Sequence, residues 1–336
     1  MGTTPSPTFS TTVIGSATNQ QQWLRACKLV VSGASGNTLD LSKLRVKFRV
    51  QSQTINTLKN AEITVYNLSP DTAKAIFSQQ EFTTLTLSAG YLNTTCAQIL
   101  VGQIVYLKMG REEALTSYLT ITAVDSDEAY NWGTINEPLE AGATPQFQLS
   151  RILTALQPFN ITAGYIPALT GASLPRGKVL YGSIKGVLDQ FASSVGRIWS
   201  IHDGVLDLYE STDTRPISGD VVTLTPRTGL IGVPEQTLDG LNVRCFLNPA
   251  IRQGSLVQIP QQYIAQTSYT GAQPNLTLPV NPSLSNNSIY RVYALTQVGD
   301  TRGPGADWYS EMICVATDKS AQLPISNTFL TAVPGK

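Results

Sequence analysis

The chain has 336 residues, of which 42% are apolar and only 14% are charged, and its 23 basic residues balance its 23 acidic ones. This length provides enough apolar material for two or three domains, each with its own core. The charge balance argues against a dedicated nucleic-acid-binding protein, because such proteins usually carry a basic excess that neutralises phosphate. Soluble domains are usually about 25% charged, and a less charged surface is common where subunits pack against one another.

The four cysteines and the single histidine are too dispersed in the sequence for a zinc ribbon or finger. Each cysteine lies among apolar residues, so we expect small buried side chains in a reducing compartment. The polar first dozen residues lack the apolar segment of a secretory signal, and no apolar run approaches the ~20 residues of a membrane span. We therefore expect a chain made in the cytoplasm without membrane insertion.

Residues 23–142 alternate between apolar and polar side chains, as a half-buried sheet does. The pattern predicts five or six strands between Arg25 and Asp125. One helix interrupts them in NLSPDTAKAIF, where Ser69 is placed to cap the helix and Pro70 fills its first position. Six strands and one helix in about a hundred residues favour a small barrel or sandwich.

The hydrophobic period changes in residues 143–212, which we expect to form a small α+β module. Thr144 followed by proline predicts the start of one helix, and Gly196 is placed to end a second helix that begins in GSIKGVLDQF. Asp203 and Gly204 then suit a two-residue primed turn between alternating strands, which predicts a tight hairpin.

Strand patterns return in residues 213–318, interrupted by a long polar loop at 260–288. The order along the chain is therefore β, then α+β, then β again. Residues 1–22 precede this region as an N-terminal arm, and residues 319–336 follow it as a C-terminal tail.

We find no catalytic, cofactor-binding or metal-binding residues in the sequence. His202 precedes a turn, and the sequence contains no GxSxG-type motif with a nucleophile that this histidine could activate. We therefore expect His202 to be solvated. The cluster of Asp125, Asp127 and Glu128 lacks the pattern of a calcium loop, and a solvated strand end is the simpler interpretation. GDTRGPGADW lacks the lysine and helix of a phosphate loop. A basic strip on one strand is interpreted as a solvated face: Arg45, Lys47 and Arg49.

The segment TGLIGVPEQTLDGLNVRCFLNPAIRQGSLVQI, residues 228–259, is constrained in shape but poor in reactive groups. Asn248 before Pro249 is held extended and starts a turn, and Gly254 lets the backbone reverse. The segment therefore predicts a strand, a tight connection and a second strand in fixed register.

Four stretches of the sequence resemble the baseplate hub proteins of contractile-tailed bacteriophages. They are NAEITVYNLSPDTAKAIF with LSAGY soon after, GSIKGVLDQFASSVGRIWSIHDGVLDLYE, the segment 228–259, and YRVYALTQVGDTRGPGADWYSEMICVA. Together they span most of residues 45–316. Relatives often carry a histidine shortly before the Gly-Asp pair, where this chain has Gln297.

The resemblance implies a mainly β fold with an α+β insertion, in which two tail-tube-like β-barrels flank the middle module. It implies a homotrimeric structural protein of the virion, located in the tail baseplate. The tail tube protein would lie above it, the central spike below, and wedge or other hub-associated proteins beside it. DNA would pass through its lumen without specific binding during genome ejection. The resemblance indicates these structural or interface candidates: Asn248, Pro249, Gly254, Gly299, Asp300, Arg302, Gly303 and Trp308.

Two other functions remain open. A carbohydrate- or receptor-binding β protein of a virion would present exposed tryptophan or tyrosine beside aspartate or asparagine. A cell-wall hydrolase of a tail tip would depend on acidic residues such as Asp125 or Glu128. Nothing in the sequence favours the enzyme.

Overall fold

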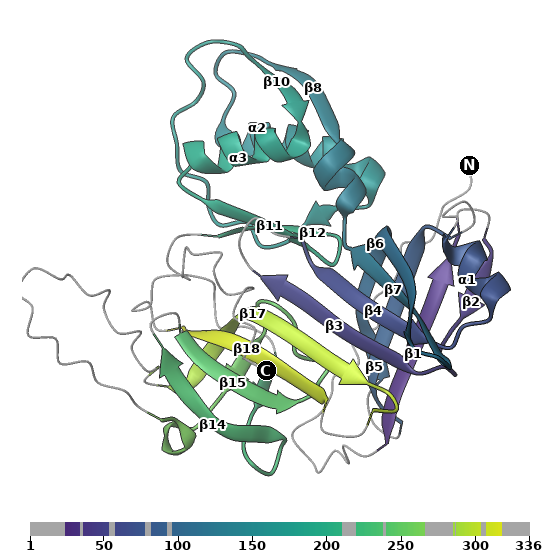
Figure 1. Cartoon of the computed structure of the whole chain (residues 1–336). Helices are drawn as coiled ribbons and strands as arrows, with labels where there is room; N and C mark the ends of the chain where they lie inside the picture. Colours follow the sequence, from purple (N-terminus) through teal and green to yellow (C-terminus); the bar gives the residue numbers. More distant parts are fainter. Residues whose placement is uncertain are drawn as a thin grey trace, which may run out of the picture.

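The chain is mainly β, with an α+β module inserted between two β lobes (Figure 1). The computed structural model describes residues 24–33, 36–53, 58–77, 82–92, 96–209, 220–237, 240–265, 285, 287–303 and 307–317. The arm 1–22, the tail 319–336 and most of the loop 260–288 lie outside the described residues. In the described part of the chain, no helix is both long and apolar enough to cross a membrane.

In its described residues, lobe 1 contains seven strands and one helix, against the five or six strands expected. Its elements are β1 (Arg25–Ser32), β2 (Thr38–Asp40), β3 (Val46–Gln53), β4 (Asn60–Tyr66), α1 (Pro70–Phe77), β5 (Thr84–Tyr91), β6 (Cys96–Glu113) and β7 (Thr116–Val124). The alternation along β3 is confirmed, since Val46, Phe48 and Val50 are buried whereas Lys47 and Arg49 are exposed. The side chains of the buried face form one hydrophobic core.

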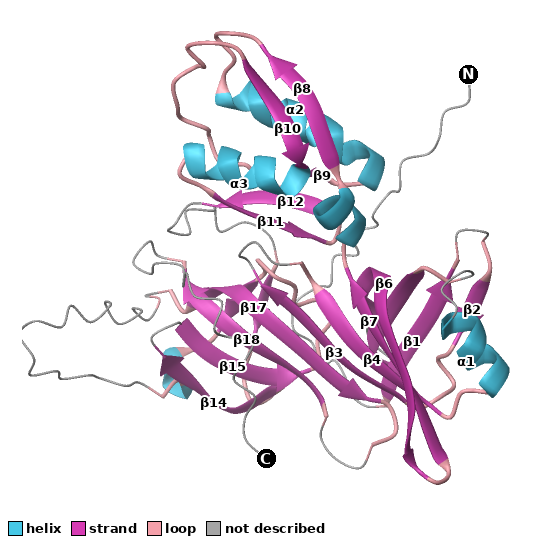
Figure 2. Cartoon of the chain, turned by 45° about the horizontal axis from the view of Figure 1, so that its top comes forward, coloured by secondary structure: helices cyan, strands magenta, loops and turns pink. Residues whose placement is uncertain are grey.

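The α+β module, defined here as residues 128–209, contains two short sheets and two main helices (Figure 2). Its elements are η1 (Glu128–Trp132), β8 (Thr134–Leu139), α2 (Pro145–Leu156), η2 (Gln157–Phe159), β9 (Thr162–Ala163), β10 (Lys178–Ser183), α3 (Ile184–Ser194), β11 (Ile198–His202) and β12 (Val205–Tyr209). It begins ahead of the boundary expected at residue 143, because β8 pairs with β10. Its apolar side chains form a core separate from that of lobe 1.

Local signals in the module are confirmed. The Thr144 hydroxyl accepts a hydrogen bond from the backbone N–H of Phe147 at 3.3 Å and caps α2. Asp203 and Gly204 both have positive φ angles, 50° and 73°, and join β11 to β12 as a primed turn. Gly196, just beyond the end of α3, has φ of 63°, a left-handed conformation that favours glycine.

Lobe 2 contains the remaining strands of the large sheet and has its own core. Its elements are β13 (Val221–Thr223), β14 (Leu230–Thr237), β15 (Gly240–Phe246), β16 (Leu256–Gln258), η3 (Gln261–Tyr263), β17 (Ile289–Asp300) and β18 (Trp308–Ala316). The segment 228–259 differs from its expected form, because β15 pairs with β14 and β18, whereas β16 pairs with β13 and β17. The turn at Asn248 therefore connects two separate parts of the lobe and is not the turn of a hairpin.

A single thirteen-stranded sheet runs through both lobes, in the order β14-β15-β18-β17-β3-β4-β7-β6-β5-β1-β2, with β16 and β13 attached beside β17. The lobes meet where β17 pairs antiparallel with β3, from Ala294 opposite Gln53 to Asp300 opposite Lys47. We call this pairing the seam. Leu247 directly follows β15 of lobe 2, but its side chain is fully buried in the core of lobe 1. The sequence alone predicts two β blocks but not this backbone connection.

Replacing Leu247 with alanine should lower the free energy of unfolding by about 2–5 kcal/mol, because it leaves a cavity in a core that closes only partly around it. Urea denaturation followed by tryptophan fluorescence measures the change. Leu115→Ala is the matched control, since Leu115 is 94% exposed and should change stability little. A Leu247→Ala protein as stable as the control would contradict the packing of lobe 2 against the core of lobe 1.

Candidate functional site

The eight interface candidates fall into two groups in the structure. One group lies at the end of β17 and the start of β18, against lobe 1: Gly299, Asp300, Arg302, Gly303 and Trp308. The other group lies in the connection between β15 and β16: Asn248, Pro249 and Gly254. The first group stands where lobe 2 contacts lobe 1. In the second group, Pro249 lines a small cavity shared with lobe 1 and the module, whereas Gly254 bonds within lobe 2.

Asp300 is the centre of the first group. Its carboxylate accepts hydrogen bonds from Arg45 Nη2 at 2.8 Å and from the backbone N–H groups of Arg302 at 3.0 Å and Gly303 at 2.8 Å. Its backbone carbonyl accepts a hydrogen bond from Arg25 Nη1 at 2.8 Å. Burial opposes ionisation of Asp300, but the hydrogen bonds from Arg45, Arg302 and Gly303 to the carboxylate outweigh it, and the pKa of the carboxyl lies below its ordinary value. One carboxylate thus links the end of β17 to lobe 1.

Two aromatic rings and a glycine pack tightly beside this carboxylate. Trp308 contacts Phe48 of β3 edge to face, with ring centroids 5.5 Å apart. A Cβ atom on Gly299 would lie 2.3 Å from the Phe48 ring, so only a hydrogen fits there. The Arg25 guanidinium lies 5.8 Å from the centroid of the Trp308 ring. The glycine and tryptophan singled out in the sequence therefore serve the packing of the seam.

The second group shapes the backbone. Asn248 accepts a hydrogen bond on Oδ1 from the N–H of Ala250 at 3.0 Å, which closes an Asx turn around Pro249. Gly254 has φ of 80°, and its N–H donates to the carbonyl of Val292 at 2.9 Å. These residues fix the path of the chain into β16 and leave no reactive group in position for chemistry.

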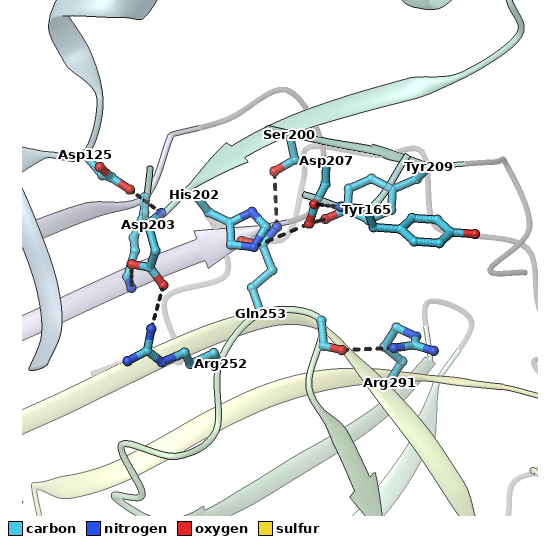
Figure 3. A network of polar contacts seen from close by, with 12 residues as sticks. Asp125, Tyr165, Ser200, His202, Asp203, Asp207, Tyr209, Arg252, Gln253 and Arg291 are labelled. Carbon is cyan, nitrogen blue, oxygen red and sulfur yellow. Dashed lines mark hydrogen bonds and ion pairs between the residues drawn. The ribbon is translucent and has the colours of Figure 1, made fainter. Parts of the chain in front are cut away.

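A network of charged side chains lies where all three units meet (Figure 3). The carboxylate of Asp203, in the turn between β11 and β12, forms two ion pairs. One is with Lys59 Nζ of lobe 1 at 2.7 Å, and the other is with Arg252 Nη1 of lobe 2 at 3.4 Å. Its backbone N–H donates to Asp125 Oδ2 at 2.5 Å. Burial opposes ionisation of Asp203, but Lys59 and Arg252 outweigh it and hold its pKa below the usual value. The sequence pattern identified the turn but not these partners.

Two expectations about polar residues here were wrong. Asp125 is buried and not solvated, and burial together with the nearby charge of Asp203 raises its pKa. His202 is also largely buried, with Nε2 3.6 Å from Asp207 Oδ2. Both side chains lie inside a contact between units that no local pattern indicates. Within the described ranges, no group of three histidine, cysteine or acidic residues could hold a metal ion.

The cysteines are all free, and one of them departs from expectation. Cys245 and Cys314 are buried as expected, whereas Cys96 is exposed at the start of β6. Cys27 is partly exposed, and burial raises the pKa of its thiol to about 12. Cys96 is therefore the most accessible thiol of the four.

Comparisons with known proteins relate the chain to tail proteins through its fold. No family model and no curated protein matches the sequence. A solved structure of the E. coli c3393 protein, described as a component of the type VI secretion system with structural similarity to the T4 bacteriophage tail proteins gp27 and gp5, matches with TM-score 0.50 and 11% identity. The match covers 83% of this chain and 76% of that one.

Two further structures match over nearly their whole length. The tail protein from Neisseria meningitidis MC58 has TM-score 0.50 and 10% identity, over 88% of this chain and 98% of that one. The 43 kDa tail protein of prophage MuSo2 from Shewanella oneidensis has TM-score 0.50 and 8% identity, over 87% and 97%. At these identities the similarity is one of fold, and that fold occurs in tail proteins of phages and prophages.

Replacing Asp300 with asparagine should lower the free energy of unfolding at pH 7 by about 2 kcal/mol, because it removes the charge that Arg45 and two backbone N–H groups bind. The folded-state pKa is depressed, so the stabilisation is complete above the ordinary pKa of 3.8 and is lost as the pH falls through the lower folded value. Urea denaturation from pH 7 to pH 2 should show wild type and variant converging below pH 4.

Asp220→Asn provides the control for this titration, because Asp220 is exposed. A stability difference between wild type and Asp300→Asn that stays constant down to pH 2 would contradict the assigned role of the carboxylate.

Proposed function

We propose that the chain is a structural protein of a bacteriophage tail, a homotrimeric baseplate hub that adapts the sixfold tail tube to the threefold central spike. The observation that supports this most is the pair of β lobes, each with its own core, joined in one sheet. The fold shared with phage and prophage tail proteins supports the same proposal. The proposal assigns the chain no catalytic activity and places it in the virion.

The two lobes give a simple route from threefold to sixfold symmetry. Three copies of a chain with two lobes present six lobes, and closed cyclic symmetry is the usual form of homo-oligomers. Six lobes in a ring could contact each of six tube subunits above, while the three chains as whole units contact the spike below. In this arrangement both lobes behave as tail-tube-like barrels, and wedge or other hub-associated proteins contact the periphery.

The open face of the large sheet fits the wall of a channel for genome passage. Arg49 stands opposite Glu62 on this face, and Arg244 forms an ion pair with Glu311 at 2.8 Å. The register from β3 through β17 and β18 to β15 places these pairs on the same side of the sheet. Because these two arginines stand beside carboxylates, their charges are locally balanced, which weakens binding to phosphate. DNA could therefore slide past it without specific binding.

Light scattering after size-exclusion chromatography tests the trimer, with an expected mass of about 109 kDa, three times the 36.2 kDa of one chain. Particle averages by electron microscopy should show a ring with six lobes around a central opening. A three-dimensional reconstruction of an assembled tail gives the decisive count. Three copies around the axis would support the proposal, whereas one or six copies would overturn it.

One observation favours a second function, a virion protein that binds carbohydrate. Trp132 and Tyr181 of the α+β module are 77% and 78% exposed, and asparagines at positions 131 and 136 are also exposed. Exposed aromatic rings beside amides are typical of sugar-binding surfaces. A glycan array should give no binding if the chain is only a hub. Binding that disappears in the Trp132→Ala, Tyr181→Ala double variant, but persists in Leu115→Ala, would favour the second function.

A further inference from the structure

The α+β module and the two lobes are joined by different kinds of contact. The lobes share a backbone ladder at the seam, whereas the strands of the module form separate two-stranded and three-stranded sheets. We propose that the module is a movable unit and that Asp203 latches it across both lobes. This inference is independent of the proposed hub function.

The latch depends on the position of one carboxylate. The turn at Asp203 and Gly204 presents the Asp203 side chain between the two lobes, where one oxygen accepts from Lys59 and the other from Arg252. Lys59 is only 8% exposed, so without Asp203 it would be a buried cation facing the carboxylate of Asp125 alone. Separating the module from the lobes is then the direct way for water to reach Lys59.

The surface around the latch is incompletely packed. A small cavity, about the size of one water molecule, is lined by residues of all three units, among them Lys59, Asp203, Pro249 and Gln297. The Nε2 group of Gln297 is buried there without a hydrogen-bond acceptor. Permanent interfaces are usually packed as densely as protein cores, and their polar groups are hydrogen-bonded. The contact between the module and the lobes lacks both features here, as expected of a contact that can open.

The chain passes between the module and the lobes at two places, which define how the module can move. Ser126, two residues before η1, has a left-handed φ of 57°. Tyr209, at the end of β12, packs in the core of lobe 2, and Leu58 of lobe 1 packs against the core of the module. These contacts retain the module beside the lobes. Loss of the latch therefore leaves a tilt of the module against the lobes and not a full separation.

Distances between two nitroxide labels, measured by pulsed electron paramagnetic resonance, test the latch in the full chain. One label is attached to the native Cys96 of lobe 1 and the other to Tyr181→Cys in β10, since both positions are exposed. The protein with native Asp203 should give one narrow distance distribution. Asp203→Asn should at least double its width, whereas Glu140→Gln, at an exposed acidic position of the module, should leave it unchanged.

An unchanged narrow distribution in Asp203→Asn would overturn the proposal, and so would a broad distribution with native Asp203. If Asp203→Asn fails to fold, the Lys59→Met, Asp203→Asn double variant replaces it, because asparagine tolerates the left-handed φ of position 203 and removing both charges leaves no unpaired buried cation. That variant should fold, with unchanged circular dichroism, and should show the doubled width. A narrow distribution in the folded double variant would also overturn the latch.

Discussion

The antiparallel pairing of β17 with β3 is the constraint on which the arrangement of this chain depends. It joins residues about 250 positions apart in the sequence and makes one sheet from two lobes that each have their own core. A backbone ladder fixes both the distance and the register between the lobes, because a shift by one residue would turn every side chain to the opposite face. The pairing therefore sets the position of one lobe relative to the other, whatever surfaces they present to other subunits.

The side chains at the end of the ladder explain why the register stays fixed. Asp300 binds Arg45 directly before β3, and Gly299 leaves room for the Phe48 ring against Trp308. These contacts combine a charged hydrogen-bond network with close aromatic packing, so a shifted register would bury an unpaired carboxylate and create steric overlap. The polar network and the packing thus select the same alignment.

Local features of the fold could be predicted from the sequence, whereas contacts between units could not. The alternation along β3, the Thr144 cap and the Asp203–Gly204 turn depend on neighbouring residues, and the structure confirms them. The seam and the burial of Asp125 depend on residues distant in sequence, which local periodicity does not specify. Glycines and the Asn-Pro turn indicated where the backbone is constrained, but not which partner imposes the constraint.

The two kinds of junction in this chain suit different tasks. A ladder of backbone hydrogen bonds cannot open in part without exposing many donors and acceptors, so the seam holds the lobes in a fixed relation. The contact around Asp203 relies on two ion pairs, a few side-chain hydrogen bonds and an imperfectly filled cavity, and it can open at the loss of few interactions. A rigid pair of lobes can set the symmetry of an assembly, while a side-chain contact lets the module adjust its orientation. Backbone hydrogen bonds therefore hold the two lobes together, whereas side-chain contacts hold the module against them.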